Sequence, residues 1–163
     1  MPTSVYDPLA VMVAGKAAAI ESLRDMLAVL GKVFVAGNTP GQAQMMKLLN
    51  NMLSQSALAM SLEAFVAGAK AGLDLDTMAA VINAGSGRNT ATEDKIPRCV
   101  LTRNFDFGFP IAGACKDIGL AIEECQALGL PMIVGSAART ASVSGRRPAG
   151  VTLPVLVTLM RVR

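Results

Sequence analysis

The stretch from Gly41 to Ala71 most constrains the fold, because across about thirty residues only Gly68 interrupts a helix-forming sequence. As one helix it would be about 45 Å long, at a rise of 1.5 Å per residue. Its apolar side chains surround the helix instead of forming one stripe, which is typical of a helix buried on most sides. They are Met45, Leu48, Leu49, Met52, Leu53, Leu58, Met60, Leu62 and Phe65. We predict a mainly α fold built on one long central helix, shared with a second copy in a homodimer or higher homo-oligomer.

The composition agrees with helices. Of the 163 residues, 52% are hydrophobic but only 4% are aromatic, so Ala, Leu, Val and Met supply the apolar mass. This favours close-packed helices over a β-sandwich and excludes disorder.

The net charge of +3 is weakly basic, and the arginines near the C-terminus are scattered, so we expect no nucleic-acid partner. No stretch reaches the roughly 20 apolar residues of a membrane span, so we expect no membrane partner.

Histidine is absent, and the three cysteines, Cys99, Cys115 and Cys125, form no C-x-x-C pair. These counts exclude His-dependent catalytic triads and His-ligated metals. They argue against structural zinc and a disulfide framework. We therefore expect no metal. With no secretory segment visible, we expect a cytoplasmic protein.

The chain begins with a pattern that differs from the long helix. Residues 9–13 form an apolar run closed by Gly15, residues 16–30 have helical periodicity, and residues 32–36 form a second short apolar run after Gly31. This predicts strand–helix–strand within residues 1–36. Residues 37–140 are predicted to form the helical domain, and residues 141–163 an atypical tail that contains two prolines.

Lys47 is the first candidate for chemistry. It lies among methionines and leucines, with Asn51 at i+4 and Ser54 at i+7 on the same helix face. A lysine in apolar surroundings releases its proton more easily and can act as a general acid or base near neutral pH. The alternative is a lysine that extends to solvent from a buried helix.

Lys116 and Asp117, at the start of a later helix, form the second candidate. The helix dipole by itself explains an aspartate there, but it does not explain a lysine. A third segment, residues 85–89 (Gly-Ser-Gly-Arg-Asn), is not a G-x-G-x-x-G loop and follows a helix, so we interpret it as a loop whose Arg88 and Asn89 could support a site. The acidic pairs at 93–94 and 123–124 are interpreted as solvated faces.

Several motifs, in order, resemble the β-hydroxyacid dehydrogenases, the 3-hydroxyisobutyrate dehydrogenase-like relatives of 6-phosphogluconate dehydrogenase. Residues 40–51 (Pro-Gly-Gln-Ala-Gln-Met-Met-Lys-Leu-Leu-Asn-Asn) resemble the catalytic helix of the family, and residues 115–121 (Cys-Lys-Asp-Ile-Gly-Leu-Ala) resemble its second Lys-Asp motif. Residues 71–74, 84–89 and 105–109 also resemble family segments. The resemblance covers roughly residues 9–140.

The resemblance implies a role for each matching residue. Lys47 would be the catalytic acid or base, and Asn51 would help to bind the substrate or to orient Lys47. Lys116 and Phe109 would bind the cofactor, NAD or NADP. The reaction would be reversible hydride transfer to or from a small 3-hydroxy acid.

The chain also departs from the family pattern. It lacks the G-x-G-x-x-G of the Rossmann domain, and the family's Gly-rich loop for the substrate carboxylate is absent. Residues 1–36 would be only the end of that domain, and Ala43 stands where many relatives have glycine. We therefore expect a truncated gene product, with or without a shifted reading frame near its end, that is inactive alone. The alternative is a non-enzymatic helical dimerisation module.

Overall fold

The structure is a computed structural model that describes residues 9–143, 146–147 and 150–151. The chain divides into two compact units, Met1–Asn50 and Asn51–Arg163. The division falls inside helix α2 (Gln42–Lys70). Each unit is described by itself.

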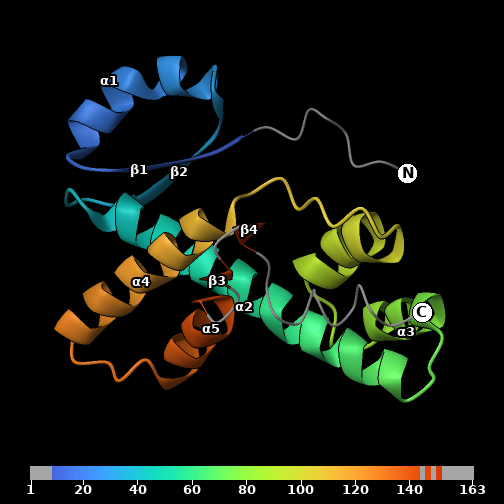
Figure 1. Ribbon diagram of the computed structural model, residues 1–163. Coiled ribbons are helices and arrows are strands. Elements are labelled where there is room, and N and C mark those ends of the chain that lie inside the picture. Colours follow the sequence, from blue (N-terminus) through green and yellow to red (C-terminus); the bar gives the residue numbers. More distant parts are fainter. Residues whose placement is uncertain (1–8, 144–145, 148–149, 152–163) are drawn as a thin grey trace. The chain divides into compact units, whose positions relative to one another are not determined.

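The first unit contains the predicted strand–helix–strand motif. Strand β1 (Leu9–Ala14), helix α1 (Ala17–Ala28) and strand β2 (Gly31–Gly37) follow one another (Figure 1). The strands are parallel, with a register shift after Val13. Gly31 has φ +156°, and a Cβ at this position would overlap the backbone of Leu9. Glycine is therefore required where the second strand begins.

The first unit leaves much of its apolar surface exposed. Among the described residues of this unit, Ile20 is the buried hydrophobic one, whereas Leu9, Met26 and Val29 are 66%, 61% and 86% exposed. Parallel sheets are normally covered on both faces. This motif therefore offers apolar surface on which further protein can pack.

Helix α2 has 29 residues, and its predicted place at the centre of the fold stays a prediction. At its start, the side-chain oxygen of Gln42 accepts the backbone N–H of Thr39 at 2.9 Å. At its end, Gly72 has φ +80° and donates to Ala69, and Leu73 donates to Gly68. These two bonds form a Schellman motif, which explains why the helix stops at a glycine. In the part of the chain that the structure describes, no helix is both long enough and apolar enough to cross a membrane.

One hydrophobic core cluster of the second unit lies between α2, α3 (Leu75–Ala84) and η1 (Ala91–Leu101). Phe105 and Phe107, from the loop after η1, pack against this core. Its buried members are Leu58, Leu62, Phe65, Ala79, Ala91, Ile96 and Val100. The mainly α prediction is confirmed.

The segment η1 has a proline in its interior, a position that a regular α-helix seldom accommodates. The structure shows an 11-residue π-helix with Pro97 inside it. A proline removes one backbone donor, which would break the regular ladder of an α-helix, and wider π turns are rare enough that no sequence pattern predicts them.

Two helices complete the described part of this unit, α4 (Ile111–Ala127) and α5 (Ile133–Val143). A Cβ on Gly135 of α5 would lie 3.2 Å from the sulfur of Met52, so glycine lets α5 approach α2 closely. The short strands β3 (Arg146–Arg147) and β4 (Gly150–Val151) pair antiparallel. The rest of the predicted tail, residues 144–145, 148–149 and 152–163, lies outside the described residues, and the predicted domain boundaries stay predictions.

Candidate functional site

Asn51 and Asp117 are in direct contact, although 66 residues separate them in the sequence. The side-chain amide of Asn51 on α2 donates to Oδ2 of Asp117 on α4 at 2.7 Å. The Asp117 side chain is only 5% exposed. A hydrogen bond to a carboxylate is stronger than one between neutral groups. The bond therefore links the two segments that the sequence analysis singled out, and it uses only one of the four hydrogen-bonding positions of the Asn51 amide.

Lys116 lies beside this pair on the exposed side of α4. Its side chain is 70% exposed, and its Nζ atom lies 4.0 Å from Oδ1 of Asp117. The buried carboxylate thus contacts an amide from α2 and lies near the ammonium group of its own neighbour. The structure brings Asn51, Asp117 and Lys116 together in one polar cluster.

Phe109 lies over the first turn of α4. A Cβ on Gly113 would lie 3.0 Å from the tip of the Phe109 ring, so glycine leaves room for that ring. Gly113 and Lys116 are three residues apart and share a helix face. Phe109 is 48% exposed. An exposed ring and an exposed ammonium group therefore lie over one end of α4.

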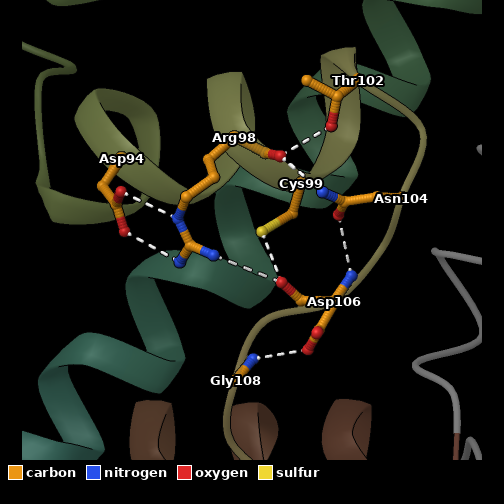
Figure 2. A network of polar contacts seen from close by, with 7 residues as sticks. All are labelled: Asp94, Arg98, Cys99, Thr102, Asn104, Asp106 and Gly108. Carbon is orange, nitrogen blue, oxygen red and sulfur yellow. Dashed lines mark hydrogen bonds and ion pairs between the residues drawn. The ribbon is translucent and has the colours of Figure 1, made fainter. Parts of the chain in front are cut away.

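The loop that leads to Phe109 is fastened to η1 by the network in Figure 2. The Asp106 carbonyl accepts from the thiol of Cys99 at 2.9 Å and from Arg98 at 3.4 Å. Asp106 Oδ1 accepts from the Gly108 backbone at 2.9 Å. Burial raises the pKa of the Cys99 thiol, so the thiol keeps the proton that it donates. This network sets the path of the chain into α4.

Lys47, the predicted acid or base, lies near the start of α2 in the first unit. Its side chain is exposed in this chain. A dry environment for the amine would therefore need further protein. Its catalytic role stays a prediction.

Arg88 and Asn89 were predicted to support a site, and the structure gives Asn89 a capping role. Its side-chain oxygen accepts the backbone N–H groups of Ala91 and Thr92 at 2.9 and 3.2 Å. Its amide donates to Ser61 on α2 at 3.3 Å. Arg88 forms an exposed ion pair with Glu93 at 3.7 Å. Asn89 therefore fixes the start of η1.

Sequence reasoning singled out Asp117 together with Lys116 but missed its contact with Asn51, because no sequence pattern connects the two residues. It missed Lys95 altogether. Lys95, on η1, donates to Ser54 on α2 at 3.2 Å. The only sequence signal for that contact was the placement of Ser54 on the same face as Asn51. In the described part of the chain, no group of three His, Cys, Asp or Glu residues could hold a metal ion.

Comparisons with known proteins identify the family. Residues 41–151 match the model of the "NAD-binding of NADP-dependent 3-hydroxyisobutyrate dehydrogenase" family. The chain is 33% identical over 139 residues to 2-(hydroxymethyl)glutarate dehydrogenase of Eubacterium barkeri, covering 85% of this chain and 46% of that protein.

Solved structures agree with this match. The structure of 3-hydroxyisobutyrate dehydrogenase from Mycobacterium tuberculosis with L-serine has a TM-score of 0.78 and 26% identity, covering 96% of this chain and 56% of that one. A structure of Psf3 with NADP+ and 2-OPP has a TM-score of 0.74 and 25% sequence identity, and the match covers 94% of this chain and 54% of that one. The chain spans about half the length of the relatives it matches. Because the family model matches residues 41–151, the chain belongs to the 3-hydroxyisobutyrate dehydrogenase family, and these residues correspond to the NAD-binding domain that the model describes.

Proposed function

We propose that this chain forms the substrate-facing and nicotinamide-facing part of an NAD(P)-dependent oxidoreductase that acts on a small 3-hydroxy acid. The observation that carries the proposal is the 2.7 Å bond between Asn51 and Asp117. It joins the segment resembling the catalytic helix to the segment resembling the second Lys-Asp motif. Relatives named as hydroxyacid dehydrogenases support the same reaction class.

Asn51 would bind the substrate, and Asp117 would hold the Asn51 amide in place. A buried carboxylate that accepts one amide N–H fixes the orientation of that amide, so the remaining amide positions point in a defined direction. Asp117 is therefore a positioning residue in this proposal.

Lys47 would move the proton. During oxidation, the hydroxyl proton passes to the neutral Lys47 amine as the carbon–hydrogen bond at the same carbon breaks. In reduction, the ammonium form returns that proton to the developing alkoxide oxygen. The nicotinamide cofactor supplies the hydride acceptor and donor when bound.

Phe109 and Lys116 would hold the cofactor. Both side chains are about half exposed or more and lie over the first turns of α4. An aromatic ring can pack against a nicotinamide, and an ammonium group can pair with a phosphate. The residues present therefore fit part of a dinucleotide.

Catalysis by the 163 residues alone is expected to be very low. Hydride transfer needs a cofactor held in near-attack geometry, and these residues contain no G-x-G-x-x-G fingerprint. The test is an initial-rate assay of the purified chain with NAD, NADP and several 3-hydroxy acids. We expect rates equal to those of Lys47→Ala, and robust turnover that Lys47→Ala abolishes would contradict the expected inactivity.

A second candidate is a dimerisation module, favoured by exposed apolar residues on α2. Leu53 and Met60, seven residues apart, are 68% and 66% exposed, and Met46, seven residues earlier, is 47% exposed. A spacing of seven places them along one side of the helix. A second copy of α2 is the occupant that we propose for this stripe, since exposed apolar residues along one side of a helix suit an interaction surface.

Sedimentation tests the module. The purified chain should sediment as a dimer or larger, and Leu53→Lys should shift it toward monomer because it places a charge in the stripe. Gln44→Lys, at an exposed position of α2 two residues before Met46 and therefore off the stripe, is the charge control and should leave the mass unchanged. A monodisperse monomer for the unmodified chain would contradict the proposal of a shared helix.

A further inference from the structure

Lys95 is a half-buried ammonium group held by a neutral partner. It lies on η1, and its Nζ atom donates to the hydroxyl of Ser54 on α2 at 3.2 Å. Both residues belong to the second unit. The contact turns the lysine toward α2.

Nearby carboxylates on η1 are already engaged by arginines. Asp94 receives two bonds from Arg98, at 3.1 and 3.2 Å (Figure 2). Glu93 pairs with Arg88 at 3.7 Å. Within the described residues, no carboxylate lies within 4.0 Å of Lys95. Lys95 therefore carries a positive charge without an ion-pair partner among those residues.

The surroundings of Lys95 favour a negatively charged ligand. Burial lowers the pKa of Lys95, although the neighbouring Asp94 partly opposes this, with Arg98 and Cys99 as the other charged or ionisable neighbours. The lowered value means that the protein stabilises the ammonium form less well than water does. An anion beside Nζ would restore that stabilisation.

Ser54 places this ammonium group next to the candidate site. It follows Asn51 by three residues, so both lie on one face of α2, about 4.5 Å apart along the helix axis. Asn51 is the residue that the proposed function assigns to the substrate. A group attached to that substrate could therefore reach Ser54 and Lys95 within one helical turn.

We propose that Lys95, supported by Ser54, binds a second acidic group of the substrate, so that the preferred substrate is a dicarboxylic hydroxy acid. The inference rests on the proposed function for the location of the substrate. Lys95 is a specificity residue in this proposal and takes no part in proton or hydride transfer.

The test compares two ligands of equal length by isothermal titration calorimetry at low salt. Glutarate has two carboxylates, and glutaramate has one carboxylate and one neutral amide. The unmodified chain should bind glutarate about tenfold more tightly than glutaramate, because one charge-assisted contact is lost with the amide. Equal affinities, or no binding of glutarate, would overturn the proposal.

Substitutions show whether Lys95 is the cause. Lys95→Met should abolish the preference for glutarate, Lys95→Arg should retain most of it, and Ser54→Ala should reduce it at least threefold. Lys70→Met is the control, because Lys70 is exposed and about 24 Å along α2 from Ser54. A preference that persists in both Lys95→Met and Ser54→Ala would overturn the proposal, and Ser54→Ala remains decisive if Lys95→Met does not fold.

These measurements need no turnover. Discrimination between the two acids without any binding of NAD(P) would sustain the anion site and contradict the proposed oxidoreductase. Binding of NAD(P) without discrimination between the two acids would support the proposed oxidoreductase and contradict the anion site.

Discussion

Asn89 holds the beginning of η1 with both ends of its side chain. The oxygen accepts two backbone N–H groups, and the amide donates to Ser61 and to the carbonyl of Gly87. The residues it caps, Ala91 and Thr92, are 0% and 2% exposed. Without the cap, these buried N–H groups would lose their acceptor. Losing it lowers the free energy of unfolding more than losing a cap at an exposed helix end would.

We therefore predict that Asn89→Ala lowers the free energy of unfolding by about 1–3 kcal/mol. Asn89→Asp keeps the acceptor oxygen and should lower the free energy of unfolding by less. Arg88→Ala, which removes only an exposed ion pair, should change stability by less than about 0.5 kcal/mol. Urea denaturation measures all three, and equal stabilities for Asn89→Ala and Arg88→Ala would contradict the capping role.

At this scale, the sequence predicted some site residues and not others. Lys47 and Asn51 could be singled out because helical spacing relates them within one segment. Asp117 could not be paired with Asn51, because nothing in one sequence reports which side chains meet after 66 residues of chain. The contact between Lys95 and Ser54 depends on the path of the π-helix, which the sequence did not predict.

Among the elements, α3 begins at a cap that depends on pH. The helix begins at Leu75 with Asp74 as its N-cap. Oδ2 of Asp74 accepts the backbone N–H of Thr77 at 2.8 Å. This bond lowers the pKa of Asp74 from its ordinary value of 3.8.

The sign of the pH effect follows from that direction. Because the pKa is lower in the folded chain, the contribution of the Asp74 carboxylate is fully present above about pH 4 and is lost as the pH falls through the folded value. Asp74→Asn keeps a neutral acceptor that does not titrate. We compare the Tm of the unmodified chain with the Tm of Asp74→Asn. The difference, unmodified chain minus variant, should fall by about 2–4 °C as the pH is lowered from 5 to 2.5. A difference that stays constant in thermal melts over this range would show that the cap is not ionised.

Elements with strong local signals were predictable, and those set by tertiary contacts were not. Gly15 and Gly31 bracket α1, and Gly72 ends α2, since these positions need backbone angles that glycine adopts easily. The π-helix around Pro97 depends instead on the core beneath it, where Ile96 and Val100 are buried.

For the whole molecule, the family membership and the exposed apolar surfaces lead to one account. The chain spans about half the length of its relatives. The strand–helix–strand unit exposes apolar residues on both strands and on α1, including Leu9, Phe34 and Met26. Helix α2 does the same through Leu53 and Met60. Such surfaces suit packing against further protein. We therefore predict that the chain binds the nicotinamide cofactor weakly and depends on additional protein for turnover.

The measurement that tests this account most directly is a fluorescence titration of NADH and NADPH with the purified chain. We predict saturable binding of at least one of them, weakened at least fivefold by Lys116→Ala and unchanged by Lys70→Ala, which removes an exposed lysine of α2. Failure of both cofactors to bind, or equal binding by Lys116→Ala, would contradict the account and leave the dimerisation module.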